Sequence, residues 1–250
     1  MSEARVWAEL PQVDTTAPEM DPTALALATA LDSLIALGAA TTPRSLQLAI
    51  GSSEAGHKCD RRLVYKLNGV PPCNFRDPLR ALFGSEAHAA LADMFRRLNA
   101  GSGRFLVETP VQYRSFPGTV DLYDRHTKTV VDWKSTTKAK LRRIRSEGAP
   151  RPYQVQLQLY AAGLAEVGEE PVRVALAYLP IDGELSDLWV WTDLVRRDVA
   201  DDAVDRVARL EGIKPADATP KPDRLCPWCD HYRPGSTDLG TGCPADNGGI

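Results

Sequence analysis

Two aspartates and a lysine stand out in the stretch from residue 118 to 134, whose sequence is GTVDLYDRHTKTVVDWK. β-Branched and aromatic residues on both sides of a charged turn predict a β-hairpin. Asp121 lies in the first strand, and Asp132 and Lys134 lie at the end of the second, where side-chain alternation points both to one face. Because a buried carboxylate is costly unless it is paired or binds a cation, the hairpin predicts a divalent-metal site. The alternative for a D-x-K triplet is a surface salt bridge at a strand end.

A further candidate ligand is His88, which lies in a stretch whose apolar residues recur with the 3.6-residue period of a helix. Gly84 comes one turn before His88 and would allow a close approach. This spacing suits an imidazole that faces the metal; the alternative is a core or surface histidine. Glu108 could supply another acid, but alternation along its strand favours a side chain that faces solvent.

A basic run follows the hairpin directly. Charge runs are usually solvated faces, but this position suits contact with phosphates, which adds affinity through counterion release. The run predicts nucleic-acid binding by Lys138, Lys140, Arg142, Arg143 and Arg145. Further on, Gln156 and Tyr160 are four residues apart on an expected helix and therefore share a face. They would orient a scissile phosphate; a half-exposed helix is the alternative.

Length and composition describe an ordinary globular chain of 250 residues, with 43% hydrophobic and 25% charged residues and a net charge of −3. With so little net charge, nucleic-acid binding must come from a local patch. We expect no apolar run of about 18 residues and no basic region followed by an apolar one. Neither a membrane span nor a secretory signal is therefore expected, and a cytoplasmic location follows by default.

Five cysteines in a cytoplasmic chain are more often metal ligands than disulfide partners. Cys226 and Cys229 form a C-x-x-C pair, and Cys243 follows after thirteen residues. Such pairs bind zinc or an iron–sulfur cluster. Cys59 is the natural fourth ligand, with Cys73 left over. The alternatives are a redox disulfide within the pair and a zinc site in which a histidine replaces one cysteine.

The remaining sequence supplies the elements that position these residues. Asp21 and Pro22 begin a helix that Gly38 would end. Strands are expected at 104–116, 119–123, 129–133, 172–180 and 185–193, and further helices at 78–99, 151–167 and 193–211.

Six short motifs occur in the order in which a known family carries them. They are Cys59-x-Arg61-Arg62-x-x-Tyr65, Gly84-x-x-x-His88, Gly118-x-x-Asp121, Asp132-x-Lys134, Gln156-x-x-x-Tyr160, and Cys226-x-x-Cys229 followed by Cys243. Together they resemble the RecB-like branch of the PD-(D/E)xK nucleases, specifically its CRISPR-associated and phage exonucleases with an iron–sulfur cluster. Two features depart from that pattern: the gap before Cys243 is longer, and an aspartate precedes the lysine where glutamate is frequent.

The resemblance implies an α/β fold with a restriction-endonuclease-like mixed sheet flanked by helices. We expect three parts along the chain: an acidic arm at 1–20, a nuclease domain at 21–220 and a cysteine segment at 221–250. Mg²⁺ or Mn²⁺ would be held by His88, Asp121, Asp132 and the carbonyl of Trp133. Catalysis would use Asp121, Asp132, Lys134, Gln156 and Tyr160, with Lys134 stabilising charge on the phosphate.

The implied activity is metal-dependent hydrolysis of phosphodiester bonds by a DNA exonuclease, mostly on single strands, in phage or host recombination, repair or processing. A 4Fe–4S cluster, or zinc as the alternative, would join the chain's two ends through Cys59, Cys226, Cys229 and Cys243. Expected partners are DNA with single strands or free ends and recombination or CRISPR-associated proteins, without a membrane; a viral protein would work in the host cytoplasm. The alternative function is a DNA-end-binding adaptor with a vestigial site.

Overall fold

The computed structural model describes residues 21–40, 50–74 and 77–245. The chain divides into two compact units, Met1–Ser45 and Leu46–Ile250. The acidic arm expected at residues 1–20 lies outside the described residues. The sheet and all candidate site residues belong to the second unit.

Helix α1 (Pro22–Ala40) is the described element of the first unit. Asp21 caps its start, because the Asp21 Oδ2 accepts a hydrogen bond from the backbone N–H of Ala24 at 3.3 Å. The helix continues past Gly38, which therefore does not end it. By length and composition its first 18 residues, with a mean hydropathy of 1.5, could cross a membrane. The expectation of no such run is wrong; core helices of water-soluble proteins and signal sequences share this length and composition.

A five-stranded mixed sheet forms the centre of the second unit. In both chain and sheet order its strands are β1 (Phe105–Tyr113), β2 (Phe116–Asp124), β3 (Thr129–Thr136), β4 (Arg173–Pro180) and β5 (Trp189–Leu194). Neighbours are antiparallel except β3 and β4, which are parallel. A parallel pair requires a crossover, and here it consists of helices α5 (Lys138–Glu147) and α6 (Arg151–Glu166).

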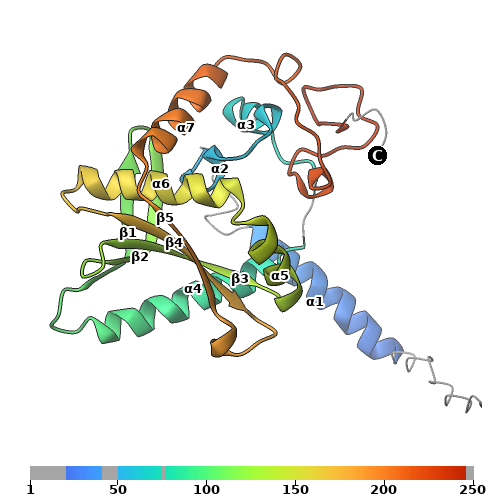
Figure 1. Ribbon diagram of the computed structural model, residues 1–250. Coiled ribbons are helices and arrows are strands. Elements are labelled where there is room, and N and C mark those ends of the chain that lie inside the picture. Colours follow the sequence, from blue (N-terminus) through green and yellow to red (C-terminus); the bar gives the residue numbers. More distant parts are fainter. Residues whose placement is uncertain (1–20, 41–49, 75–76, 246–250) are drawn as a thin grey trace, which may run out of the picture. The chain divides into compact units, whose positions relative to one another are not determined.

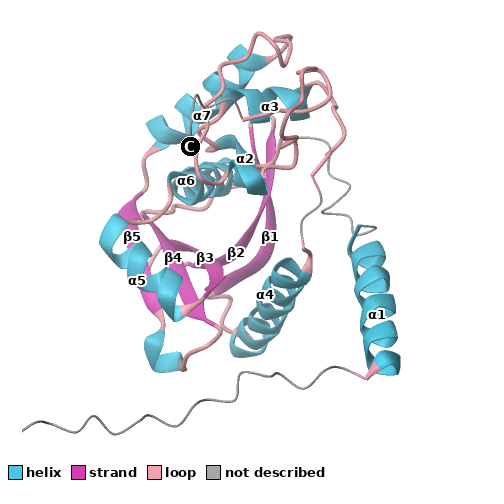
Figure 2. Ribbon diagram, turned by 90° about the vertical axis from the view of Figure 1, so that its right-hand side faces the viewer, coloured by secondary structure: helices cyan, strands magenta, loops and turns pink. Residues whose placement is uncertain are grey.

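Helices cover both faces of this sheet. Helix α6 packs along β1 to β4 on one face, and α4 (Leu79–Leu98) crosses β1 to β3 on the other (Figure 1 and Figure 2). Helices α2 (Ser52–Ala55), α3 (Asp60–Leu67) and α7 (Arg197–Leu210) lie on the α6 side. Short 3₁₀ helices occupy Leu185–Asp187 and Cys226–Trp228. The predicted mixed sheet flanked by helices is confirmed.

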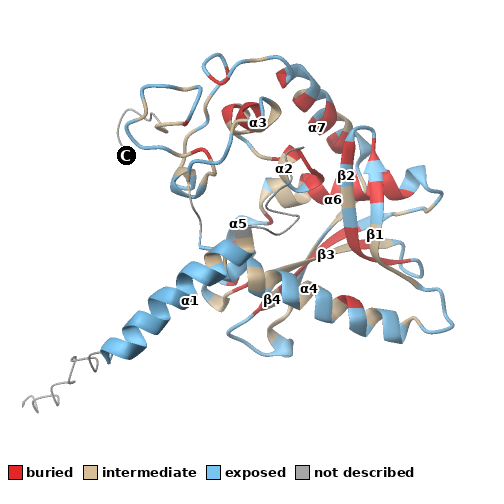
Figure 3. Cartoon of the chain, turned by 180° about the vertical axis from the view of Figure 1, so that it is seen from behind, coloured by how far each residue is buried: buried red, intermediate tan, exposed pale blue. Residues whose placement is uncertain are grey.

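The two covering helices differ sharply in burial (Figure 3). Helix α6 is buried without interruption from Val155 to Leu164, whereas α4 buries only Ala92. The 3.6-residue period of α4 predicts a core-facing helix, yet Phe83 and Leu98 are 60% and 69% exposed. The main core therefore lies between the sheet and α6.

Side-chain alternation along the sheet is interrupted at one place. Glu108 of β1 and Asp121 of β2 lie opposite each other, but they make no ladder pair, although the register continues on both sides. Glu108 has a φ of 47°, which is uncommon for a residue other than glycine. On β2, beside this break, Val120 and Tyr123 are three residues apart and both enter the same buried cluster. A regular strand would point them to opposite faces.

Gly56 lies where α2 meets α6, and an added Cβ would lie 2.7 Å from the Val155 Cβ and 2.8 Å from the Pro152 Cα. Since the backbone of Pro152 cannot easily move, we expect Gly56→Ala to lower the free energy of unfolding by about 1–3 kcal/mol. Urea denaturation measures this change.

The matched control is Gly84→Ala inside α4, where no atom lies within 4 Å of an added Cβ. This variant should be neutral or more stable by up to about 1 kcal/mol, because alanine favours helix. A Gly56→Ala protein as stable as the wild type would contradict the close packing of α2 on α6.

Candidate functional site

Three carboxylates lie side by side across three neighbouring strands. Glu108 of β1 is opposite Asp121 of β2, and one further step in the β2–β3 register places Asp132 of β3 opposite Asp121. The β2–β3 ladder stops at this step. The backbone N–H of Trp133 donates instead to the Asp121 Oδ2, at 2.8 Å. Like charges directly opposite each other destabilise a sheet, so this row calls for a neutralising cation.

His88 of α4 contacts the middle carboxylate of this row. Its Nδ1 lies 3.3 Å from the Asp121 Oδ2, a contact that raises the pKa of His88. One ligand atom from each of His88, Glu108 and Asp121 lies within 4.8 Å of the others. Among the residues that the structure describes, no other set of three histidine, cysteine or acidic side chains does so. This oxygen-rich donor set fits a hard divalent cation.

The expectation that Glu108 faces solvent is wrong. The side chain is half-buried beside Asp121. The pKa of Glu108 is raised, mainly by burial and in addition by the negative charge of Asp121. Alternation fails here because the positive φ of Glu108 interrupts the pleat. Such backbone strain, on the order of 1–3 kcal/mol, clusters at functional sites. The close approach expected at Gly84 is also wrong, since no atom lies near the position of its absent Cβ.

Asp132 and Lys134 form a short ion pair at the buried end of the row. Asp132 is 1% exposed, and its Oδ2 lies 2.6 Å from the Lys134 Nζ without the angles of a hydrogen bond. Burial raises the pKa of Asp132 to about 6, and the nearby charge of Lys134 opposes this rise. The fold therefore holds this carboxylate where its negative charge is poorly solvated.

Helix α6 connects to the site through Lys134. The Lys134 Nζ lies 3.4 Å from the Gln156 Oε1, and the Gln156 Nε2 donates to the Tyr160 hydroxyl at 2.7 Å. The Lys134 Nζ also lies 4.6 Å from the ring centroid of Tyr153. The sequence placed Gln156 and Tyr160 on one helical face, but it gave no signal for Tyr153.

The absence of a side chain at Gly118 leaves room for the Tyr160 ring, which lies next to Gln156. An added Cβ at Gly118 would lie 2.5 Å from the Tyr160 Cε1 and 2.9 Å from the Ser52 Oγ. The Ser52 hydroxyl donates to the carbonyl of Pro117 at 3.0 Å and fixes α2 against β2. A glycine three residues before Asp121 thus leaves room for an aromatic ring beside the site.

The basic run forms the amphipathic helix α5, which directly follows β3. Leu141 and Ile144 are buried, whereas Lys140, Arg142, Arg143 and Arg145 are exposed. Lys138 is already paired with Asp187 at 2.9 Å. The other cations are more open: Arg143 lies 3.6 Å from Glu147, Arg145 lies 5.9 Å from the Trp189 ring, and Lys140 and Arg142 have no side-chain partner among the described residues.

The cysteine segment folds back onto the α3 region. The backbone N–H of Cys73 donates to the carbonyl of Asp230 at 2.9 Å, and that of Cys243 donates to the carbonyl of His231 at 2.7 Å. The rings of Tyr65 and His231 stack at 4.7 Å. The segment after α7 and the segment around α3 are therefore packed together.

All five cysteines are free thiols. The Cys59 Sγ accepts a hydrogen bond from the backbone N–H of Lys221, and the Cys226 Sγ accepts one from that of Asp223. Burial raises the pKa of Cys229, which also lies within electrostatic reach of Cys59. In the described part of the chain, no three of the thiol sulfurs lie within 4.8 Å of one another.

Comparison with solved structures finds several chains that match this one at low sequence identity and with TM-scores below 0.5. They include SSO0001 (14% identity, TM-score 0.46, 82% of this chain and 93% of that one). They also include an alkaline exonuclease from Laribacter hongkongensis (11%, 0.47, 65% and 86%) and a phage-related exonuclease from Haemophilus somnus 129PT (13%, 0.40, 61% and 77%). No curated protein sequence gives a significant match.

A family model gives a more direct result. The model described as the PD-(D/E)XK nuclease superfamily matches residues 103–233, which is more than half of the chain. This stretch contains the whole sheet and the three aligned carboxylates. The chain therefore belongs to the PD-(D/E)XK nuclease superfamily and is a nuclease.

Proposed function

We propose that this nuclease is a metal-dependent DNA exonuclease that acts mostly on single strands. The observation that supports it best is the row of three carboxylates beside an imidazole and an ammonium group. A structural salt bridge would need one acid and one base, whereas this row has an excess of negative charge. That excess fits a cation and, through it, a phosphate.

Mg²⁺ or Mn²⁺ would be held by His88, Glu108, Asp121 and Asp132, with the Trp133 carbonyl as a further ligand. The carboxylate oxygens suit either ion, and the imidazole favours Mn²⁺ somewhat. A bound divalent ion would polarise the phosphate and make a coordinated water more acidic.

Lys134 supplies a positive charge beside the place of reaction. Its side chain is 19% exposed and is oriented by Asp132, by Gln156 and by the ring of Tyr153. A fixed ammonium stabilises the negative charge that grows on the phosphate oxygens. Tyr160, hydrogen-bonded to Gln156, extends this chain and would help to position the strand.

A preference for single strands is supported by the aromatic and basic residues next to the site. Tyr153 lies beneath Lys134, and Trp189 lies beside Arg145 of α5. Proteins that bind single strands combine cationic grooves with aromatic rings on which bases stack. The outward-facing cations of α5 would hold the backbone phosphates.

We further propose a 4Fe–4S cluster on Cys59, Cys226, Cys229 and Cys243, as in the iron–sulfur branch that the sequence resembles. The C-terminal segment folds back onto the α3 region, and Cys229 lies within electrostatic reach of Cys59, which supports ligands from both parts of the chain for one cluster. Its binding energy would hold the C-terminal segment to α3.

An adaptor with a vestigial site is the alternative function, and the complete set of acids with Lys134 speaks against it. A cytoplasmic location and partners in recombination or spacer acquisition stay predictions.

Removal of the charged groups should abolish cleavage. We expect Asp132→Asn and Lys134→Met each to slow Mn²⁺-dependent cleavage of an end-labelled single-stranded oligonucleotide about 100-fold or more, because each removes a charge at the reacting phosphate. Glu108→Gln should weaken Mn²⁺ binding about tenfold or more in a metal titration.

Asp217→Asn and Lys214→Met are matched controls at exposed positions and should cleave normally. Full activity of either the Asp132 or the Lys134 variant would refute the proposed site.

The metal-free protein should lose stability as the pH rises from about 4 through about 6. Burial raises the pKa of Asp132 from 3.8 to about 6, so folding favours its protonated form, and that advantage disappears above the folded-state pKa. At pH 7.5, Asp132→Asn should therefore unfold at a higher urea concentration than the wild type. Its free energy of unfolding should be larger by roughly 1–3 kcal/mol. The two proteins should be equally stable at pH 4; an unchanged difference across this range would contradict the raised pKa.

Anaerobically purified protein should be brown, with visible absorbance from an iron–sulfur cluster. Cys226→Ser should remove the colour, because it removes a proposed ligand, while Cys73→Ser should keep it. Colourless protein with one zinc per chain, measured by metal analysis, would show that the cluster proposal is wrong.

A further inference from the structure

A cavity of about 610 Å³ lies between the loop after α2, the first turns of α6, helix α7 and residues 219–221. Its lining contains none of the residues assigned above to metal, catalysis, cluster or DNA contact. The volume is within the range of small-molecule sites, roughly 300–1,000 Å³.

The floor of the cavity is apolar and buried. Ala55 of α2, Val155 of α6, and Val199 and Ala203 of α7 contribute it, and each of them is at most 7% exposed. Such a floor excludes water and offers contact to the flat, weakly polar part of a ligand.

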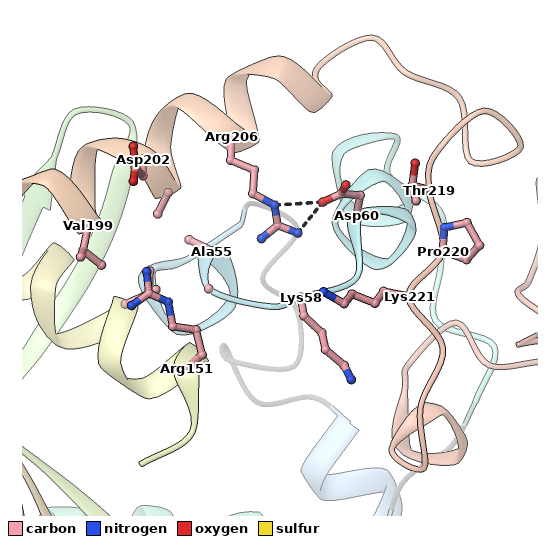
Figure 4. Close-up of a pocket in the computed structure, with 13 residues that line it drawn as sticks. Ala55, Lys58, Asp60, Arg151, Val199, Asp202, Arg206, Thr219, Pro220 and Lys221 are labelled. Carbon is pink, nitrogen blue, oxygen red and sulfur yellow. Dashed lines mark hydrogen bonds and ion pairs between the residues drawn. The ribbon is translucent and has the colours of Figure 1, made fainter. Parts of the chain in front are cut away.

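The rim of the cavity is rich in cations. It carries four basic and two acidic side chains: Lys58, Arg151, Arg206 and Lys221 against Asp60 and Asp202. Figure 4 shows Arg151 on one side of the cavity and Lys58 and Lys221 on the other. The rim thus presents positive charge from two sides.

Only part of this charge is neutralised within the protein. Arg206 donates to Asp60 at 2.9 Å, and Lys58 pairs with Asp223 at 2.5 Å. The side chains of Arg151 and Lys221 form no ion pair or hydrogen bond with any described residue. These two cations suit the phosphate of a nucleotide, and the apolar floor suits its base and sugar.

The cavity shares the beginning of α6 with the proposed catalytic site. Val155 lines the cavity, and the next residue, Gln156, reaches Lys134. Gly56, which also lines the cavity, packs tightly against Pro152 in the first turn of this helix. A strand bound at the cavity would therefore lie beside the helix that positions Lys134.

We propose that this cavity binds one nucleotide of the DNA strand, with its phosphate between Arg151 and Lys221. The inference rests on the proposed function and adds a second contact point for the substrate, separate from the metal and from α5. Each phosphate neutralised on a single strand contributes about 0.7 to the slope of log affinity against log salt.

The test measures binding of a fluorescein-labelled, 20-nucleotide oligo(dT) strand to the full chain by fluorescence anisotropy. It is done without divalent metal and over a series of KCl concentrations. The double variant Arg151→Ala with Lys221→Ala should bind about tenfold more weakly, and its salt slope should be smaller by about 0.7, the contribution of one phosphate. Arg151→Lys with Lys221→Arg, which keeps both charges, should retain the wild-type slope.

The control pair is Arg209→Ala with Lys214→Ala, two exposed cations outside the cavity that give the same change in net charge. An equal loss in this pair, or no loss in the cavity pair, would overturn the proposal.

Thymidine monophosphate is then added as competitor. Displacement from the wild type only would support a site that also takes free nucleotides, and no displacement alongside the slope change would support one that requires a strand. Because binding is measured without metal, a wild type that never cleaves single strands would refute the proposed exonuclease activity and leave this result standing.

Discussion

Repulsion among three carboxylates is the constraint around which this sheet is arranged. Glu108, Asp121 and Asp132 lie opposite one another on adjacent strands, where like charges destabilise pairing. The ladder is interrupted at this row on both sides of Asp121, and the Trp133 N–H turns to the Asp121 carboxylate instead. The strands thus keep their register, and His88 of α4 contacts the Asp121 carboxylate at 3.3 Å.

The same constraint accounts for the unfavourable features of the site. Glu108 adopts a positive φ, and Asp132 is a buried acid with a raised pKa. Each feature lowers stability without a cation, and each is offset when positive charge arrives. Lys134 provides part of that charge from within the chain, and helix α6 holds it in place through Gln156. The unliganded protein thus gives up stability at a site that is arranged to bind metal and phosphate.

Much of this arrangement was predictable from local sequence. The hairpin, the acids with Lys134 and the shared face of Gln156 and Tyr160 depend on periods of 2 and 3.6 residues, which short stretches encode. Glu108 was mispredicted because those periods assume regular backbone, and the break in alternation arises only when β1 meets β2. Contacts such as Tyr153 beneath Lys134 depend on how α6 docks. The apolar side chains that α4 exposes likewise contradict its periodicity.

The most direct measurement is a crystal structure of the protein with Mn²⁺, examined by anomalous scattering. The account predicts a manganese peak within coordination distance of the His88 imidazole and of the Glu108, Asp121 and Asp132 carboxylates, with Lys134 beside it. A peak bound elsewhere, or a protein that takes up no manganese while these side chains keep their places, would contradict it.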